Sequence, residues 1–232
     1  MRANQFKGIS NFIKVNPEAI RNLTSPFEGI AAILENYQKQ FGRFSEKAAE
    51  KGWFVTSCTD IKGMASAYSR GDDELDNFME AEIESNFDKI KASIITANEA
   101  RAHILNPAFD LHSSNNWVAS IPLFLAQTDG IFSAKIGAFL FSEHEKRKNL
   151  ILEKYGQKSS GIIPYMCSPF EVYTQFGASI GSKSKDKKKQ GPNRNGILHG
   201  SRKHLDYATK INSLKCISLL SYINMFFDIE ST

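Results

Sequence analysis

An arginine and a histidine stand five positions apart in the segment Arg194-Asn195-Gly196-Ile197-Leu198-His199, and a polar residue directly follows the arginine. The arginine guanidinium is a permanent, forked cation that fits phosphate oxygens, and the histidine imidazole gives and takes protons near neutral pH. Placed together, these groups could cleave a phosphodiester without a metal ion. Arg194, Asn195 and His199 are therefore the candidate catalytic residues.

A basic loop, residues 182–191, precedes this motif. Between Ser182 and His204, eight Lys or Arg residues stand against the single acidic residue Asp186. Such a patch attracts phosphate backbones electrostatically, without reading sequence. The candidate polyanion-binding residues are Lys185, Lys187, Lys188, Lys189, Arg202 and Lys203. A lysine run is equally typical of a solvated loop, and an exposed, passive position is the simpler expectation for Lys203 and His204.

Structural roles compete with the chemical one at each position of the motif. Arg194 could cap helix carbonyls or pair with Asp206, and His199 could lie at a helix end. Tyr207 could form hydrogen bonds in a cleft, although packing against the last helix is favoured. Gln127 and Asp129 interrupt an apolar helix, so they either support the motif or face a solvated groove.

Composition limits the class of protein. The chain of 232 residues has a formal net charge of +4, with 41% hydrophobic and 23% charged residues, as in ordinary soluble globular proteins. The three scattered cysteines favour reduced thiols over a disulfide framework or a zinc site. The N-terminus lacks the apolar region of a signal peptide, and Asp129 within the apolar run Trp117–Phe141 argues against a membrane span. We therefore expect a cytoplasmic protein without metal, cofactor or membrane segment.

Helical periodicity accounts for most of the chain. Ser25-Pro26-Phe27-Glu28 is a strong helix start, and that helix should end at Gly52. A shorter helix is expected over residues 59–69. The longer segments with apolar positions at helical spacing are residues 72–105, 117–141, 145–155, 168–177 and 209–227. No alternating strand pattern occurs. The prediction is an all-α fold, an irregular bundle of about six or seven helices, with residues 1–70 as an N-terminal helical layer and residues 71–232 as the main domain.

The motif and the residues that follow it resemble the HEPN superfamily. That signature is an Arg, a polar residue and then a His, and the continuation His199-Gly200, Asp206-Tyr207 and Asn212-Ser213-Leu214-Lys215 resembles bacterial members. The resemblance implies a HEPN-like helical domain, commonly dimeric, acting as a metal-independent endoribonuclease in toxin–antitoxin or phage-defence systems. It implies attack of a ribose 2′-OH on the adjacent phosphate, with Arg194, Asn195 and His199 at a cleft shared by two subunits and Asp206 and Tyr207 in support.

Helix geometry agrees with a shared site. Five residues of a regular α-helix turn through roughly 500°, which leaves two side chains about 140° apart. Arg194 and His199 of one chain would then converge poorly, unless the helix is broken or a second copy completes the site. The expected partners are RNA, a second copy of the chain and an inhibitory antitoxin protein. The alternative is a non-catalytic helical module that binds RNA or protein, or a defence-system scaffold.

Overall fold

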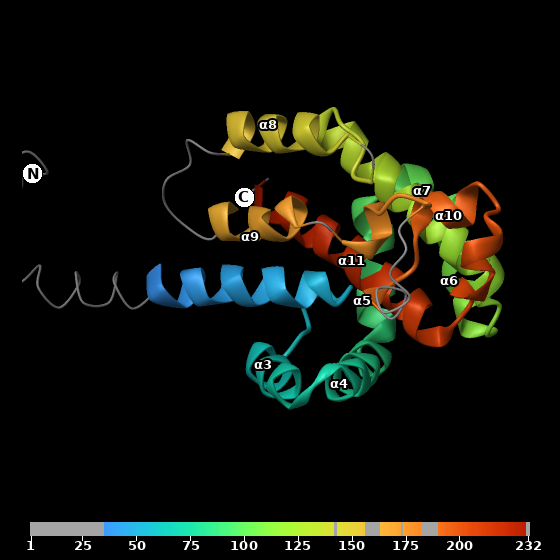
Figure 1. The fold of residues 1–232 in the computed structure, drawn as a ribbon, viewed down its shortest axis with the longest axis horizontal. Coiled ribbons are helices and arrows are strands. Elements are labelled where there is room, and N and C mark those ends of the chain that lie inside the picture. The colour runs from blue at the N-terminus through green and yellow to red at the C-terminus, as the bar shows by residue number, and fades with distance from the viewer. Residues whose placement is uncertain (1–34, 142, 156–162, 173, 182–189, 231–232) are drawn as a thin grey trace, which may run out of the picture. The chain divides into compact units, whose positions relative to one another are not determined.

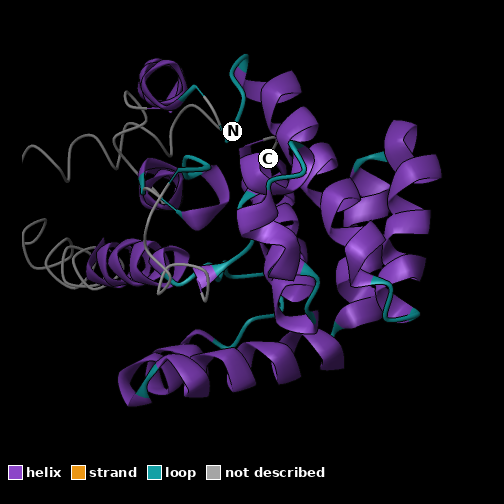
Figure 2. Ribbon diagram, turned by 45° about the vertical axis from the view of Figure 1, so that its right-hand side comes forward, coloured by secondary structure: helices purple, strands orange, loops and turns teal. Residues whose placement is uncertain are grey.

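The computed structural model describes residues 35–141, 143–155, 163–172, 174–181 and 190–230. Throughout these ranges the chain consists of helices joined by loops and turns, with no strand (Figure 2). The predicted all-α fold is confirmed.

Two compact units divide the chain, Met1–Phe41 and Gly42–Thr232. The described part of the first, residues 35–41, is helical, and the second begins with residues 42–50, which are also helical. Residues 42–70 thus belong to the same unit as the helices that follow them. The predicted helix start at Ser25 lies outside the described residues.

The second unit contains all the labelled helices (Figure 1). In chain order they are α3 (Ile61–Arg70), α4 (Asp72–Ser85), α5 (Phe87–Ala97), η1 (Glu99–Arg101), α6 (Ala102–Ser113), α7 (Trp117–Ile136), α8 (His144–Tyr155), α9 (Ile163–Glu171), η2 (Gln175–Gly177), α10 (Arg194–Leu198), η4 (Arg202–Tyr207) and α11 (Lys210–Glu230).

Helix α11 forms the centre of this unit. It packs against α7, α5, α4 and α9, and every residue from Ser213 to Asn224 is buried. The sequence pattern predicted apolar positions at helical spacing over residues 209–227, and between Ser213 and Asn224 the polar side chains are buried as well as the apolar ones. The polar face is covered, because its side chains find partners on neighbouring elements: Asn224 Oδ1 accepts from Asn98 at 2.9 Å, and Lys215 Nζ lies 3.3 Å from Asp76 Oδ1.

The single helix expected over residues 72–105 is divided into α4, α5, η1 and the beginning of α6, which continues to Ser113. The breaks fall at Asn86 and Asn98, whose side-chain amides donate to the carbonyls of Glu82 (3.0 Å) and Ile94 (2.8 Å), four residues earlier. Asparagine competes with the backbone for such hydrogen bonds, so it ends helices that apolar spacing alone would continue. The apolar stripe survives the breaks, because Leu75, Met79 and Ile83 of α4 and Ile90 and Ile94 of α5 are all buried.

Helix α7 also ends earlier than the predicted Phe141. Gly137 adopts φ +86° and donates its N–H to Ser133 O at 2.9 Å, a left-handed helix end that glycine favours. The chain then turns back, so Leu140 and Phe141 lie beside Asp129 of the same helix. This turn positions the candidate site.

A buried histidine joins α6 to α11. His112 is 7% exposed, stacks on Phe87, and its Nδ1 lies 2.8 Å from Ser213 Oγ. Burial lowers the pKa of His112 from 6.5 to about 4, while the Glu84 charge opposes this shift and the Lys210 charge adds to it. Because the unfolded chain binds the proton more readily, this contribution to stability is complete above the unfolded pKa and is lost as pH falls toward the folded one.

We expect His112→Phe to reduce the loss of stability between pH 6.5 and pH 4. Phenylalanine keeps the stacking on Phe87 but cannot take up a proton, so the free-energy difference between wild type and variant should change by about 2 kcal/mol over this range. Urea unfolding at closely spaced pH values measures the difference. If the free energies of unfolding of the two proteins changed in parallel with pH, the loss of stability could not be assigned to protonation of His112.

Candidate active site

Asn193 fixes the start of the short helix α10. Its Oδ1 accepts from Gly196 N at 2.6 Å, and its Nδ2 donates to Ala178 O at 2.9 Å. An asparagine at this position satisfies a helix-terminal N–H, and the side chain is almost entirely buried. Arg194 follows directly in the chain, so this cap fixes the backbone position from which the Arg194 side chain extends.

Arg194 is anchored by a buried carboxylate. Its Nη2 lies 3.1 Å from Asp129 Oδ2 on α7, and its Nη1 donates to Asn195 Oδ1 at 3.0 Å. The Arg194 side chain is 25% exposed, whereas that of Asp129 is 4% exposed. Asp129 thus lies buried against the motif rather than in a solvated groove, and the described ion pair of Arg194 is with Asp129.

Asp129 also holds the turn that follows α7. Its Oδ1 accepts from the backbone N–H of Leu140 at 2.8 Å and of Phe141 at 3.4 Å. Burial raises the pKa of Asp129, and the Arg194 charge and these two N–H groups counter that effect. Gln127, the other polar residue noted on this helix, instead accepts from Arg101 Nη1 at 2.9 Å.

His199 lies at the opposite end of α10 from Arg194. The helix ends at Leu198, His199 N donates to Asn195 O at 3.1 Å, and Gly200 follows with φ +62°. The imidazole is exposed and forms no hydrogen bond within the described part of the chain. The arginine is thus fixed, and the histidine is presented to solvent at the end of a helix of five residues.

Gly196 makes room for His204. A Cβ atom at residue 196 would lie 2.2 Å from His204 Cδ2 and 2.4 Å from Cγ, so the imidazole packs directly on the glycine. His204 is buried, which corrects the expectation of an exposed, passive residue. The close approach of the two segments explains the glycine inside the motif, where helix propensity alone disfavours it.

Tyr207 attaches η4 to α7. Its hydroxyl donates to Val118 O at 2.8 Å. Val118 stands four residues before Pro122, and proline has no N–H to bond that carbonyl. Tyr207 therefore satisfies a carbonyl freed by Pro122, and burial raises the pKa of its phenol.

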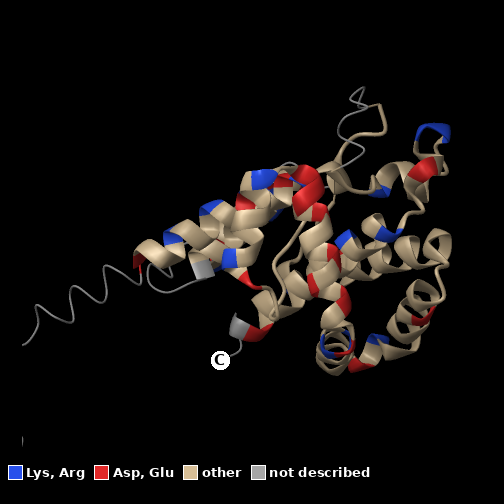
Figure 3. Cartoon of the chain, turned by 90° about the horizontal axis from the view of Figure 1, so that it is seen from below, with Lys and Arg blue, Asp and Glu red and all other residues tan. Residues whose placement is uncertain are grey.

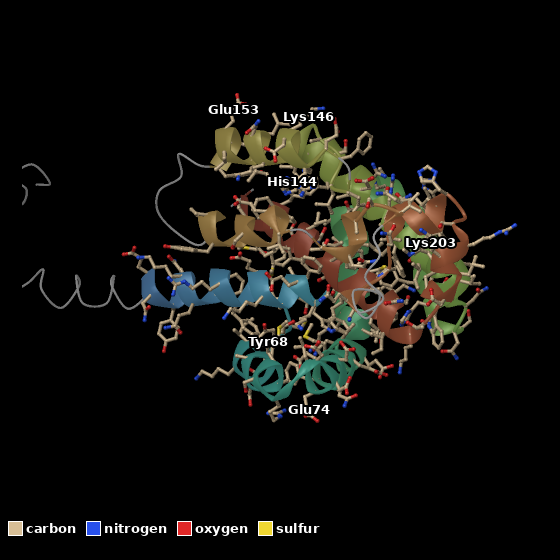
Figure 4. The ribbon with its side chains drawn as sticks, viewed as in Figure 1. Tyr68, Glu74, His144, Lys146, Glu153 and Lys203 are labelled. Carbon is tan, nitrogen blue, oxygen red and sulfur yellow. The ribbon has the colours of Figure 1, made fainter. Side chains whose placement is uncertain are left out.

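The remaining candidate residues lie at the surface or outside the described ranges. Arg202, Lys203 and Asp206 are exposed on η4, and Figure 4 shows Lys203 extending outward. Lys185, Lys187, Lys188 and Lys189 fall outside the described residues. Elsewhere Lys and Arg are interspersed with Asp and Glu along the helices (Figure 3).

Large apolar side chains are exposed on α10 and on the two elements α7 and η4 that contact it. They are Val118 on α7 (56% exposed), Leu198 on α10 (42%) and Leu205 on η4 (69%). Helix α10 contacts both α7 and η4. Exposed apolar groups on neighbouring elements are a feature of protein interaction surfaces.

No family model matches the chain, and no curated protein or solved structure matches it. The HEPN resemblance therefore stays a prediction carried by the motif residues. Within the described ranges, no helix combines the length and apolar character needed to cross a bilayer. The same ranges contain no group of three or more His, Cys, Asp or Glu side chains suited to hold a metal ion.

Sequence reasoning did not find the roles of Asn193 and of the Leu140–Phe141 turn. Asn193 carried a usable signal, because an asparagine directly before a helix is a typical N-cap. The turn carried none, since nothing local indicates which amides a carboxylate eleven residues earlier will bind.

Removing the Asp129 carboxylate should destabilise the fold. We expect Asp129→Ala to cost about 2–4 kcal/mol, because it leaves the buried Leu140 and Phe141 amides without their acceptor and the half-buried Arg194 without its partner. Asp129→Asn keeps an acceptor for Leu140 N–H and should cost about 1–3 kcal/mol.

The matched control for Asp129 is Asp110→Asn. Asp110 pairs with Lys91 at 2.9 Å, but its side chain is 69% exposed, so the loss should stay below about 1 kcal/mol. Urea unfolding compares the three variants, and equal costs at residues 129 and 110 would refute the anchoring role.

Gly196→Ala tests the packing of His204. Helix propensity alone would make this substitution stabilising by up to about 1 kcal/mol, whereas the clash with the imidazole should destabilise by about 1–3 kcal/mol. Gly181→Ala is the control, because no atom of the described, non-adjacent residues lies within 4 Å of its Cβ position. Thermal unfolding shows whether the substitution raises or lowers stability, and a stabilised Gly196→Ala protein would overturn the packing argument.

Proposed function

We propose that the protein is a metal-independent endoribonuclease of the HEPN type, acting in a toxin–antitoxin or phage-defence system. One observation carries this proposal. At the start of α10 an arginine is fixed by a buried carboxylate, and directly after the end of the same helix a histidine is exposed to solvent. A fixed cation and a mobile proton carrier are the two groups that phosphodiester cleavage by an internal hydroxyl needs.

Arg194 would stabilise the charge that develops on the phosphate oxygens. A guanidinium has five N–H groups, and the described bonds to Asp129 and Asn195 engage two of them. The second N–H groups of Nη1 and Nη2 can donate to a phosphate, whereas Nε is buried and has no hydrogen-bond partner among the described residues. Anchoring also lowers the entropic cost of holding the cation in place during the reaction.

His199 would transfer the proton. It would take the proton of the ribose 2′-OH or protonate the leaving 5′-oxygen, so that the products carry a 2′,3′-cyclic phosphate and a 5′-hydroxyl. The need for a 2′-OH restricts the substrate to RNA. Asn195, which accepts from Arg194 and donates to Ala178 O at 3.4 Å, acts in this proposal as a positioning residue.

A second copy of the chain would complete the site. Arg194 and His199 stand at opposite ends of α10, so the two groups of one chain reach one phosphate less readily than groups from two chains. The exposed Val118, Leu198 and Leu205 supply apolar contact area for such a dimer. An antitoxin or other inhibitory protein would cover the basic loop 182–191, and Arg202 and Lys203 would bind RNA from η4.

The second candidate function is a non-catalytic helical module or defence scaffold that binds RNA or protein. The Arg194–Asp129 pair favours it, because the carboxylate already neutralises the cation that would have to stabilise phosphate charge. In this case α10 and η4 would serve only as a binding surface.

Cleavage of total RNA in the presence of EDTA separates the two functions. We expect the wild-type protein to cleave, and His199→Ala and Arg194→Ala each to lower the rate at least about 100-fold, the lower range for general acid–base catalysis. The product ends should carry cyclic phosphate, detectable by their resistance to phosphatase without prior acid treatment.

His103→Ala, at an exposed histidine of α6, is the matched control and should cleave normally. Full activity of both motif variants would refute the site, and a requirement for added divalent metal would refute the mechanism. RNA binding without cleavage by the wild type would favour the binding module.

A further inference from the structure

A second site, a cavity of about 130 Å³, lies between α8, α9 and α11, and none of the residues that line it belongs to the motif. Its apolar walls include Phe54, Leu140, Phe141, Phe170 and Leu219, and Arg147 also lines it. His144 stands at the edge with its side chain 39% exposed. In Figure 4 it lies on the side of α8 that faces α9, while Lys146 points outward.

Arg147 brings an almost fully buried cation to this cavity. The residue is 6% exposed, and its guanidinium donates to backbone carbonyls only: Nε and Nη2 bond Phe170 O at 3.2 and 3.0 Å, and Nη1 bonds Leu140 O. Among the described residues no carboxylate forms an ion pair with it. Burial lowers the pKa of Arg147, and the charge of Asp129 only partly counters that effect.

The buried positive charge of Arg147 therefore has no anionic partner among the described residues. A buried charge is costly unless an opposite charge pairs with it. The three carbonyl bonds fix the plane of the guanidinium and leave two of its five N–H groups for another acceptor. An anion that entered the cavity would meet a rigid, desolvated donor, and such charge-assisted bonds are the strong ones.

The volume of the cavity and its apolar lining determine the size and polarity of the rest of the ligand. A cavity of about 150 Å³ lined by Leu, Ile and Phe accommodates a benzene ring, so the volume here fits one ring or a short branched chain. An inorganic anion would have to give up its hydration shell against these apolar walls, whereas a ligand with an apolar body gains from contact with them.

We propose that this cavity is a binding site for a small monocarboxylate with a ring-sized apolar body, held by Arg147 through its carboxylate. The apolar body packs between Phe141, Phe170 and Leu219. The ligand enters past His144, Val172 and Thr174, which are not fully buried. The site contains no residue of the 194–199 motif, so the assignment does not depend on the proposed ribonuclease function.

Titration of the full chain with benzoate and with benzamide, its uncharged analogue, tests the assignment by calorimetry. Benzoate should bind to a single site at least tenfold more tightly than benzamide, and inorganic phosphate should not displace it. Saturable binding that meets both conditions supports the proposal. Absence of saturable benzoate binding, equal affinity for benzamide, or displacement by phosphate would each overturn it.

Two variants locate the site. Arg147→Met should remove the preference for benzoate, and Lys146→Met, which deletes an exposed charge one residue away, should retain it. Because Arg147→Met removes three backbone hydrogen bonds and can impair folding, Val172→Trp provides an independent test: it keeps Arg147 and fills the cavity from its rim. Loss of benzoate binding in Val172→Trp, with an unchanged helical circular dichroism spectrum, supports the site, and unchanged binding would overturn it.

Discussion

The buried carboxylate of Asp129 is the interaction on which the arrangement of the candidate site depends. One oxygen accepts from the backbone of Leu140 and Phe141, and the other pairs with Arg194. A single side chain of α7 thereby connects the turn after its own helix to α10, which lies far along the chain. Burial of a charge is tolerated here because a cation and two amide groups surround it.

Helix α10 is held by its surroundings rather than by its own length. A helix of five residues is too short to be stable alone, so side chains fix each part of it. Asn193 caps the start and bonds Ala178, Gly196 lets the His204 ring pack against the backbone, and Tyr207 ties the following η4 to the carbonyl that Pro122 leaves unpaired. These contacts hold the short helix in a defined position among its neighbours.

Leu140 connects the candidate active site with the separate cavity. Its N–H donates to Asp129, and its carbonyl accepts from Arg147, so two buried charges of opposite sign hold the two sides of one residue. The two charged groups have different kinds of partner. Asp129 forms an ion pair with Arg194 of α10. Arg147 bonds only carbonyl groups among the described residues, and two of its N–H groups remain for an anion.

The sequence by itself determined the helical class of this protein, the start of α7 at Trp117, the extent of α8 and the existence of α11, because these follow from spacing and capping within one segment. It also indicated that Asp129 needed a partner. Only the tertiary structure decided that this partner is Arg194, 65 residues away, that Gly196 and His204 pack together, and that the polar face of α11 is buried. Periodicity records which residues share a face of one helix, but it holds no information on which other segment covers that face.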